Sequence, residues 1–124
     1  MPGPKPTIRL HLWIETEKGV FFGVGRAQLL QKVDECGSLK KAADELGMSY
    51  RAAWGKIKKT EEAMGERLIE QCGCRKDGYR LTEFGMFIKD NYLLWYSQVE
   101  EEALKKARDL FPWPVRSYED TNPP

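Results

Sequence analysis

The chain has 124 residues, 41% of them hydrophobic, which is enough to bury one core but not two. Its formal net charge is +1, so composition alone does not indicate a polyanionic partner. No apolar run has the length of a membrane span, and the first residues lack the apolar segment of a secretory signal. We therefore expect a single cytoplasmic domain without a membrane partner.

The N-terminal part of the chain predicts a tail, a hairpin and a helix. Residues 1–6 are proline-rich and are expected to be a disordered tail. Apolar and polar residues alternate over 7–15, which predicts a half-buried strand. A short turn then returns residues 20–22 as a second strand, giving a β-hairpin. Leucine spacing predicts a helix over about 25–36, ended by Gly37.

The segment 38–64 contains two short amphipathic helices joined by a glycine-containing turn. Ser38 can cap the first helix, and Ser49 can cap the second. Small residues at positions 42 and 43 allow the two helices to approach closely, and Gly47 can adopt the positive φ that the turn needs. The inward stripe of the second helix consists of Ala53, Ile57, Thr60 and Met64. This pattern predicts a helix-turn-helix, a motif that binds DNA.

The outward face of the second helix is the candidate surface for reading a DNA groove. It carries Tyr50, Arg51, Trp54, Gly55 and Lys58. Residues 38–59 hold six basic side chains and two acidic ones, an excess of four in an otherwise balanced chain. Such local asymmetry is typical of a DNA-facing surface. The alternative interpretation is an ordinary solvated pair of helices with surface lysines.

After this motif the sequence predicts a wing over 67–81. Residues 67–71 and 79–81 read as two strands around a sharp turn, and such a flap directly after a recognition helix is a wing. Arg75, Lys76 and Arg80 on or beside its tip are expected to lie near phosphates, or to reach the minor groove if the wing lies along the duplex.

A long helix is predicted over 82–110, capped by Thr82. Its apolar residues spread around much of the circumference, which indicates more than one neighbour. The simplest second neighbour is the same helix of another subunit, which would place two recognition helices roughly 34–36 Å apart. The alternative is enclosure by its own domain. The expected dimerisation residues are Phe87, Tyr92, Leu94, Trp95 and Val99. The predicted DNA-binding domain spans 7–111, followed by a proline-rich tail over 112–124.

No catalytic, cofactor or metal motif stands out. His11 is the only histidine and has no nucleophile placed beside it by a recognisable motif. Gly23 and Gly25 lack the third glycine and the surrounding βαβ unit of a dinucleotide-binding loop. The cysteines at 36, 72 and 74 are too few for structural zinc, and they are either coincidental thiols or a labile redox or metal sensor. We expect no enzyme activity, cofactor or bound metal.

Several motifs together resemble a known family. Residues 22–26, 37–43, 46–54 and 81–85 resemble the N-terminal domain of the ModE family of molybdate-responsive transcriptional regulators. The helix-turn-helix of that family is itself similar to the LysR type. The resemblance covers about Thr7 to Leu110. It implies a mainly α (α+β) winged helix-turn-helix with an N-terminal β-hairpin, a two-stranded wing and a long C-terminal dimerisation helix.

The resemblance also implies a recognition helix with Arg51 as a base or phosphate contact. The full candidate set of DNA-binding residues is Ser38, Lys40, Ser49, Tyr50, Arg51, Trp54, Gly55, Lys58, Arg75, Lys76 and Arg80. The family's C-terminal molybdate-binding modules have no counterpart in this sequence, so molybdate binding is not expected from this chain alone. The functional hypothesis is a homodimeric, sequence-specific regulator of transcription that binds double-stranded DNA. The alternative is a degenerate winged helix that binds a partner protein instead of DNA.

Overall fold

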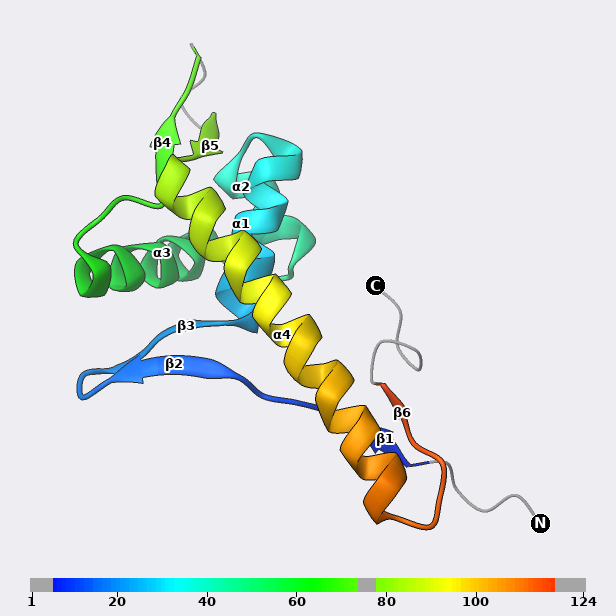
Figure 1. Cartoon of the computed structure of the whole chain (residues 1–124). Coiled ribbons are helices and arrows are strands. Elements are labelled where there is room, and N and C mark those ends of the chain that lie inside the picture. The colour runs from blue at the N-terminus through cyan, green and yellow to red at the C-terminus, as the bar shows by residue number, and fades with distance from the viewer. Residues whose placement is uncertain (1–5, 74–77, 118–124) are drawn as a thin grey trace. The chain divides into compact units, whose positions relative to one another are not determined.

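The structure, a computed structural model, describes residues 6–73 and 78–117. Its elements in chain order are β1 (Thr7–Ile8), β2 (Trp13–Thr16), β3 (Gly19–Gly23), α1 (Val24–Cys36), α2 (Leu39–Glu45), α3 (Tyr50–Met64), β4 (Ile69–Gln71), β5 (Tyr79–Leu81), α4 (Glu83–Leu110) and β6 (Arg116–Ser117) (Figure 1). The chain forms two compact units. The larger one, here the central unit, runs from Leu12 to Leu93, and the terminal unit joins residues up to His11 with those from Leu94 onward.

The core of the central unit lies between α1, α2 and α3. Fully buried side chains come from all three helices, and they are Ala27, Leu29, Leu30, Val33, Leu39, Ala42, Ala43, Ala53, Ile57 and Thr60. The small side chains of Ala42 and Ala43 let α2 pack closely, as predicted. Gly47 has a φ of +69° in the turn between α2 and α3. The predicted helix-turn-helix is confirmed.

Two serines begin the helices of this motif. The Ser38 hydroxyl accepts a hydrogen bond from the Lys41 amide at 3.2 Å, and the Ser49 hydroxyl accepts one from the Ala52 amide at 3.0 Å. Each bond satisfies a donor that has no partner inside its helix. The inward stripe of α3 ends one turn earlier than predicted. Met64 is 39% exposed because it is the last residue of the helix, directly before Gly65.

The N-terminal hairpin differs in part from the prediction. The expected strand over 7–15 is divided into β1 and β2, and only β2 pairs antiparallel with β3, with a register irregularity after Ile14. Ile14 is 40% exposed, whereas Phe22 on β3 is fully buried. All of β2 is exposed, so the alternation of apolar and polar residues in this strand does not correspond to a buried and an exposed face. The Thr60 hydroxyl donates a hydrogen bond to the Phe21 carbonyl, which fastens the hairpin to α3.

The predicted wing is formed by β4 and β5, which pair antiparallel with Glu70 opposite Arg80. The end of β5 nearest the hairpin turn is hydrogen-bonded to the chain that begins α2. The Tyr79 amide donates to the Gly37 carbonyl at 3.0 Å, and Gly78 forms a β-bridge with Ser38. The wing is therefore attached to the helix-turn-helix by backbone contacts.

The first turn of α4 packs against the backbone that leads into the wing. Thr82 caps the helix as predicted, because its hydroxyl accepts from the Gly85 amide at 3.0 Å. The same hydroxyl donates to the Arg67 carbonyl at 2.6 Å, and the Thr82 amide donates to the Leu68 carbonyl at 3.0 Å. These bonds hold the helix start on the chain before β4.

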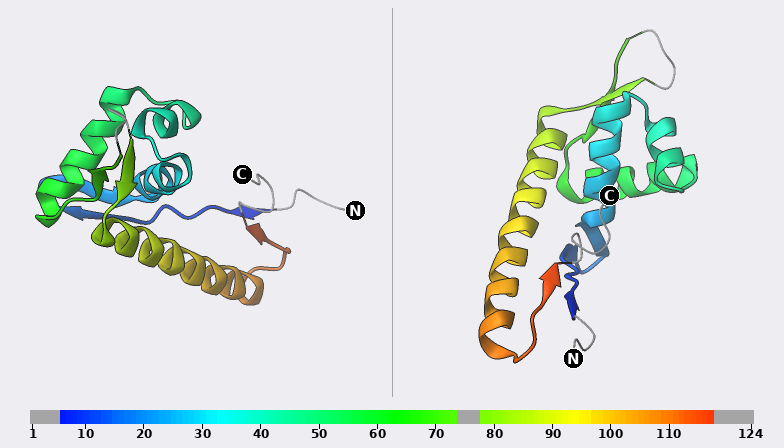
Figure 2. Two further views of the ribbon diagram at one scale, coloured as in Figure 1. Left: turned by 90° about the horizontal axis from the view of Figure 1, so that it is seen from above. Right: turned by 90° about the vertical axis from the view of Figure 1, so that its right-hand side faces the viewer.

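The terminal unit contains a parallel pairing that the sequence did not predict. β6 lies within the expected proline-rich tail, yet it pairs with β1, and Figure 2 shows the two strands side by side. Val115 is 6% and Ser117 is 6% exposed. The Tyr96 hydroxyl donates to the Leu10 carbonyl at 3.3 Å. In the described ranges, no helix combines the length and the apolar character needed to cross a membrane.

Candidate nucleic-acid interface

The outer face of α3 is open to solvent. Arg51 and Gly55 are exposed, and the Lys58 side chain is 60% exposed. Ala53, Ile57 and Thr60 anchor the opposite face in the core. Because the buried and exposed positions alternate with helical period, the cationic side chains are directed away from the protein.

Trp54 stands between this face and the wing. Its ring meets the Tyr79 ring edge to face at 5.4 Å, and the Tyr50 ring at 6.3 Å. The Lys58 ammonium lies 5.4 Å from the centroid of the Trp54 ring, within the range of a cation–π contact. Trp54 is consequently half-buried, and it joins α3 to β5. Sequence reasoning missed Tyr79, whose one signal is an aromatic residue at the start of the second wing strand.

Glu61 is a second positioning residue that the sequence did not single out. Its side chain is 11% exposed, and its Oε2 atom accepts a hydrogen bond from the Leu68 amide at 2.8 Å. Its Oε1 atom lies 3.8 Å from the Lys58 ammonium. Glu61 therefore links the end of α3 to the chain entering the wing and orients a cation on the outer face.

Arg80 on the wing is exposed but paired. Its Nε atom lies 2.9 Å from Glu70 Oε1, and the two side chains are 68% and 42% exposed. A solvent-exposed ion pair of this kind contributes about 0–1 kcal/mol, so Arg80 can exchange its carboxylate for a phosphate at low cost. The predicted contacts Arg75 and Lys76 lie outside the described residues.

One polar candidate, Ser38, and one nearby arginine, Arg26, are engaged within the protein. Ser38 is 3% exposed and its hydroxyl is engaged in capping α2, so its side chain is not presented to a duplex, contrary to our prediction. Arg26 donates from Nε to the Lys56 carbonyl at 3.3 Å, and partial burial lowers the pKa of its guanidinium. Arg26 therefore braces α1 against α3. By contrast, Lys40 and Ser49 are exposed.

Of the residues predicted to form a dimer interface on α4, one is buried within its own chain and the others are exposed or half-buried. Tyr92 is 3% exposed, its hydroxyl donates to the Leu12 carbonyl at 2.6 Å, and its ring packs on Phe22, so its assignment to an interface between subunits is wrong. Phe87 and Leu94 are 62% and 55% exposed. Trp95 is 39% exposed, and Val99 is half-buried.

The thiols do not gather into a site within the described ranges. The Cys36 thiol donates to Glu45 Oε2 at 3.5 Å, and its pKa is raised by partial desolvation and by this hydrogen bond. Cys72 is half-buried, and Cys74 lies outside the described residues. Among the residues described, no three His, Cys, Asp or Glu side chains are grouped as metal ligands.

The packing of α1, α2 and α3, the exposed basic face of α3 and the adjoining β4–β5 flap define a winged helix-turn-helix. Residues 25–86 match the bacterial regulatory helix-turn-helix proteins of the lysR family, and the chain belongs to this family. The family consists of regulatory proteins, in agreement with the prediction that the chain is not an enzyme.

Individual relatives support the fold. The transcriptional regulator ModE of Haemophilus influenzae is 28% identical over 67 residues, which are 54% of this chain and 26% of that regulator's length. The structure of the BenM DBD in complex with catB site 1 DNA has a TM-score of 0.53 at 24% identity, over 68% of this chain and 90% of that one. The CbnR DBD–DNA complex has a TM-score of 0.55 at 19% identity, over 68% and 93% of the two chains.

Proposed function

We propose that this chain is a sequence-specific regulator of transcription that binds double-stranded DNA through α3 and the β4–β5 wing. The observation that carries the proposal is the outer face of α3, where Arg51 and Lys58 are exposed while the opposite face is buried. In a recognition helix, such side chains reach base edges and phosphates in the major groove. The domain that performs this binding comprises residues 7–111.

The relatives support this proposal and a finer assignment. Two of the structural relatives are complexes with DNA, and their winged helix-turn-helix domains share this fold. The similarity to the ModE regulator and the motifs at 46–54 and 81–85 favour a regulator of the ModE type. Because the matched segment is 26% of that relative, the assignment concerns the matched portion alone.

We also propose that the regulator acts as a homodimer through α4. Phe87 and Leu94 are seven residues apart, which is close to two helical turns, and both side chains are more than half exposed. Large apolar side chains exposed on one helix are typical of an interaction surface. A two-fold symmetric pair would read a roughly palindromic operator.

The first experiment separates base reading from general attraction. Preferred duplexes are selected from a random pool with the full chain, and affinities are then measured for a selected and an unrelated duplex. Arg51→Ala should weaken binding to the selected duplex by about 1–3 kcal/mol, the range for one good base contact. Lys58→Ala and Arg80→Ala should weaken binding to both duplexes and flatten the salt dependence. Arg108→Ala, an exposed arginine on α4, is the matched control. If Arg51→Ala binds every duplex as the parent does, α3 is not the recognition helix.

The second candidate function is a protein-interaction module, favoured by the exposed apolar residues of α4. Light scattering after size exclusion, with and without duplex, distinguishes the two. A monomer that ignores DNA supports the module, whereas a dimer that binds duplex supports the regulator.

A further inference from the structure

The exposed face of α3 lies between two β-hairpins. The wing contacts α3 at Trp54, whereas the β2–β3 hairpin approaches it at Lys59. At about 100° per residue, Trp54 and Lys59 are separated by roughly 140° around the helix, and Arg51 and Lys58 project between them. A helix in the major groove, which is about 12 Å wide, has a phosphate backbone on each side. The wing is proposed to contact the phosphate backbone on one side of α3. The β2–β3 hairpin is positioned to contact the phosphate backbone on the other side.

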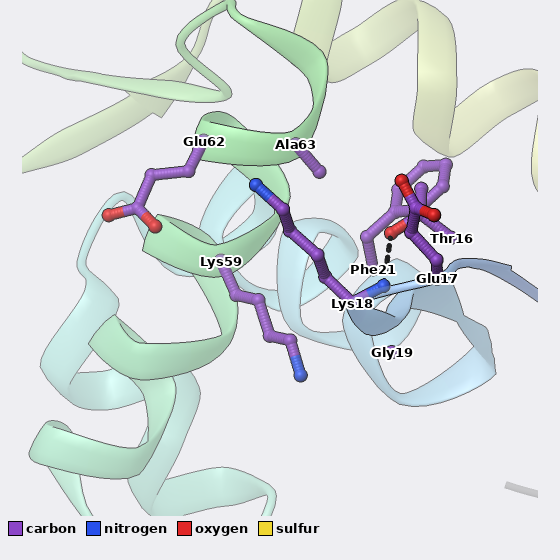
Figure 3. Close-up of a pocket in the computed structure, with 8 residues that line it drawn as sticks. All are labelled: Thr16, Glu17, Lys18, Gly19, Phe21, Lys59, Glu62 and Ala63. Carbon is purple, nitrogen blue, oxygen red and sulfur yellow. Dashed lines mark hydrogen bonds between the residues drawn. The ribbon is translucent and has the colours of Figure 1, made fainter.

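A hollow of about 400 Å³ lies where this hairpin meets α3 (Figure 3). Thr16 to Gly19 of the hairpin turn line it on one side, and Lys59, Glu62 and Ala63 of α3 line it on the other. The hairpin is attached to α3 at this point, because the buried Thr60 hydroxyl donates a hydrogen bond to the Phe21 carbonyl. The hollow is therefore built from two elements that are fastened to each other.

Two lysines reach across this hollow in opposite directions. Figure 3 shows Lys18 extending from the hairpin turn toward α3, while Lys59 extends from α3 toward the turn. The Lys59 ammonium lies 3.2 Å from the position a Cβ would take on Gly19, which has a φ of +116°. A glycine at this point thus permits both the turn and the close approach of the ammonium. Within residues 6–73 and 78–117, neither lysine has an ion-pair partner.

We infer that the β2–β3 hairpin is a second phosphate-binding flank, in which Lys18 and Lys59 contact the phosphodiester backbone on the side of α3 away from the wing. The inference rests on the proposed DNA-binding function and extends it to a surface outside the helix-turn-helix and wing. Ammonium groups held beside a groove-reading helix neutralise phosphates and release counterions, which gives affinity without sequence preference. Glu17 and Glu62 line the same hollow and oppose this attraction. Replacing either glutamate should therefore strengthen DNA binding, whereas replacing either lysine should weaken it.

The test measures affinity for a mixed-sequence duplex over a range of salt concentrations, with the full chain. Lys18→Gln and Lys59→Gln should each weaken binding several-fold at low salt and reduce the slope of log affinity against log salt by about 0.9, the value for one phosphate. The preference for the selected duplex over an unrelated one should not change. Glu17→Gln and Glu62→Gln should each strengthen binding several-fold. Lys105→Gln, an exposed lysine on α4, should leave affinity and slope as in the parent.

The outcomes separate this inference from the proposed function. If both lysine variants keep the parent affinity and slope while Arg51→Ala loses its preferred duplex, the hairpin inference is overturned and the DNA-binding proposal stands. If Lys105→Gln weakens binding as much as Lys18→Gln, the effect is one of net charge, and the inference is likewise overturned. If the parent protein binds no duplex, the proposed DNA-binding function is refuted, and the hairpin inference that rests on it is refuted with it. Thermal melting of each variant confirms that the loss is not due to unfolding.

Discussion

Gly85 offers the sharpest test of how the wing and α4 are packed. A Cβ added at this residue would lie 2.1 Å from the Leu68 carbonyl oxygen and 3.0 Å from its carbon. Ordinary contact begins near 3.4 Å, so in Gly85→Ala the Leu68 carbonyl must retreat by more than 1 Å. That carbonyl accepts the Thr82 amide at 3.0 Å, and a retreat of this size breaks the bond.

The magnitude follows from three contributions. Forcing a methyl group into a packed contact costs about 1–3 kcal/mol. Leaving a buried carbonyl without its donor costs about 1–3 kcal/mol more. The higher helix propensity of alanine returns about 1 kcal/mol. We expect Gly85→Ala to lower the free energy of unfolding by about 3 kcal/mol, which shifts the urea midpoint, followed by circular dichroism, by about 1–3 M.

Gly55→Ala is the matched control, because it is the same exchange within a helix. No atom lies within 4 Å of a Cβ added at Gly55. Only the propensity contribution remains there, so this variant should be about 1 kcal/mol more stable than the parent. If Gly85→Ala is as stable as the parent, the close packing of α4 on Leu68 is refuted.

Three further variants test single contacts. Ser49→Ala removes the cap of α3 and should lower the free energy of unfolding by about 1 kcal/mol in urea titrations; an unchanged midpoint would exclude a capping role. Glu70→Gln frees Arg80 and should raise the affinity for arbitrary duplexes several-fold at low salt, and unaltered binding would mean that this part of the wing does not face DNA. Glu45→Gln should lower the pKa of Cys36, because the carboxylate raises it; at pH 8 the thiol should then react faster with a disulfide reagent in a background without the other cysteines, and slower reaction would contradict the assignment.

The helix-turn-helix could be predicted because its determinants are local. The caps at Ser38 and Ser49 and the positive φ of Gly47 each depend on a few neighbouring residues, and the structure contains all three. The inward stripe of α3 follows from helical period alone, and it fails only at Met64, where the helix ends. The outward direction of Arg51 and Lys58 follows from the same period.

The features that were missed depend on contacts between distant residues. Glu61 has the appearance of an ordinary surface carboxylate, but it is held by the Leu68 amide seven residues later. Tyr92 belongs to an apolar helix with several possible partners, and its ring packs on Phe22 while its hydroxyl donates to the Leu12 carbonyl, 80 residues away. The pairing of β6 with β1 joins the two ends of the described chain, and no local pattern in either strand indicates it.

The backbone bridge between the wing and the beginning of α2 has a mechanical consequence. Because the Tyr79 amide is bonded to the Gly37 carbonyl and Gly78 is paired with Ser38, backbone contacts restrain the distance between β5 and the start of α2. If the chain binds DNA as proposed, a wing restrained in this way does not adjust its spacing to the target, and the strain of an imperfect match falls on the DNA. Base steps that bend easily then favour complex formation even where no side chain touches them, and a target would be selected partly for its elasticity.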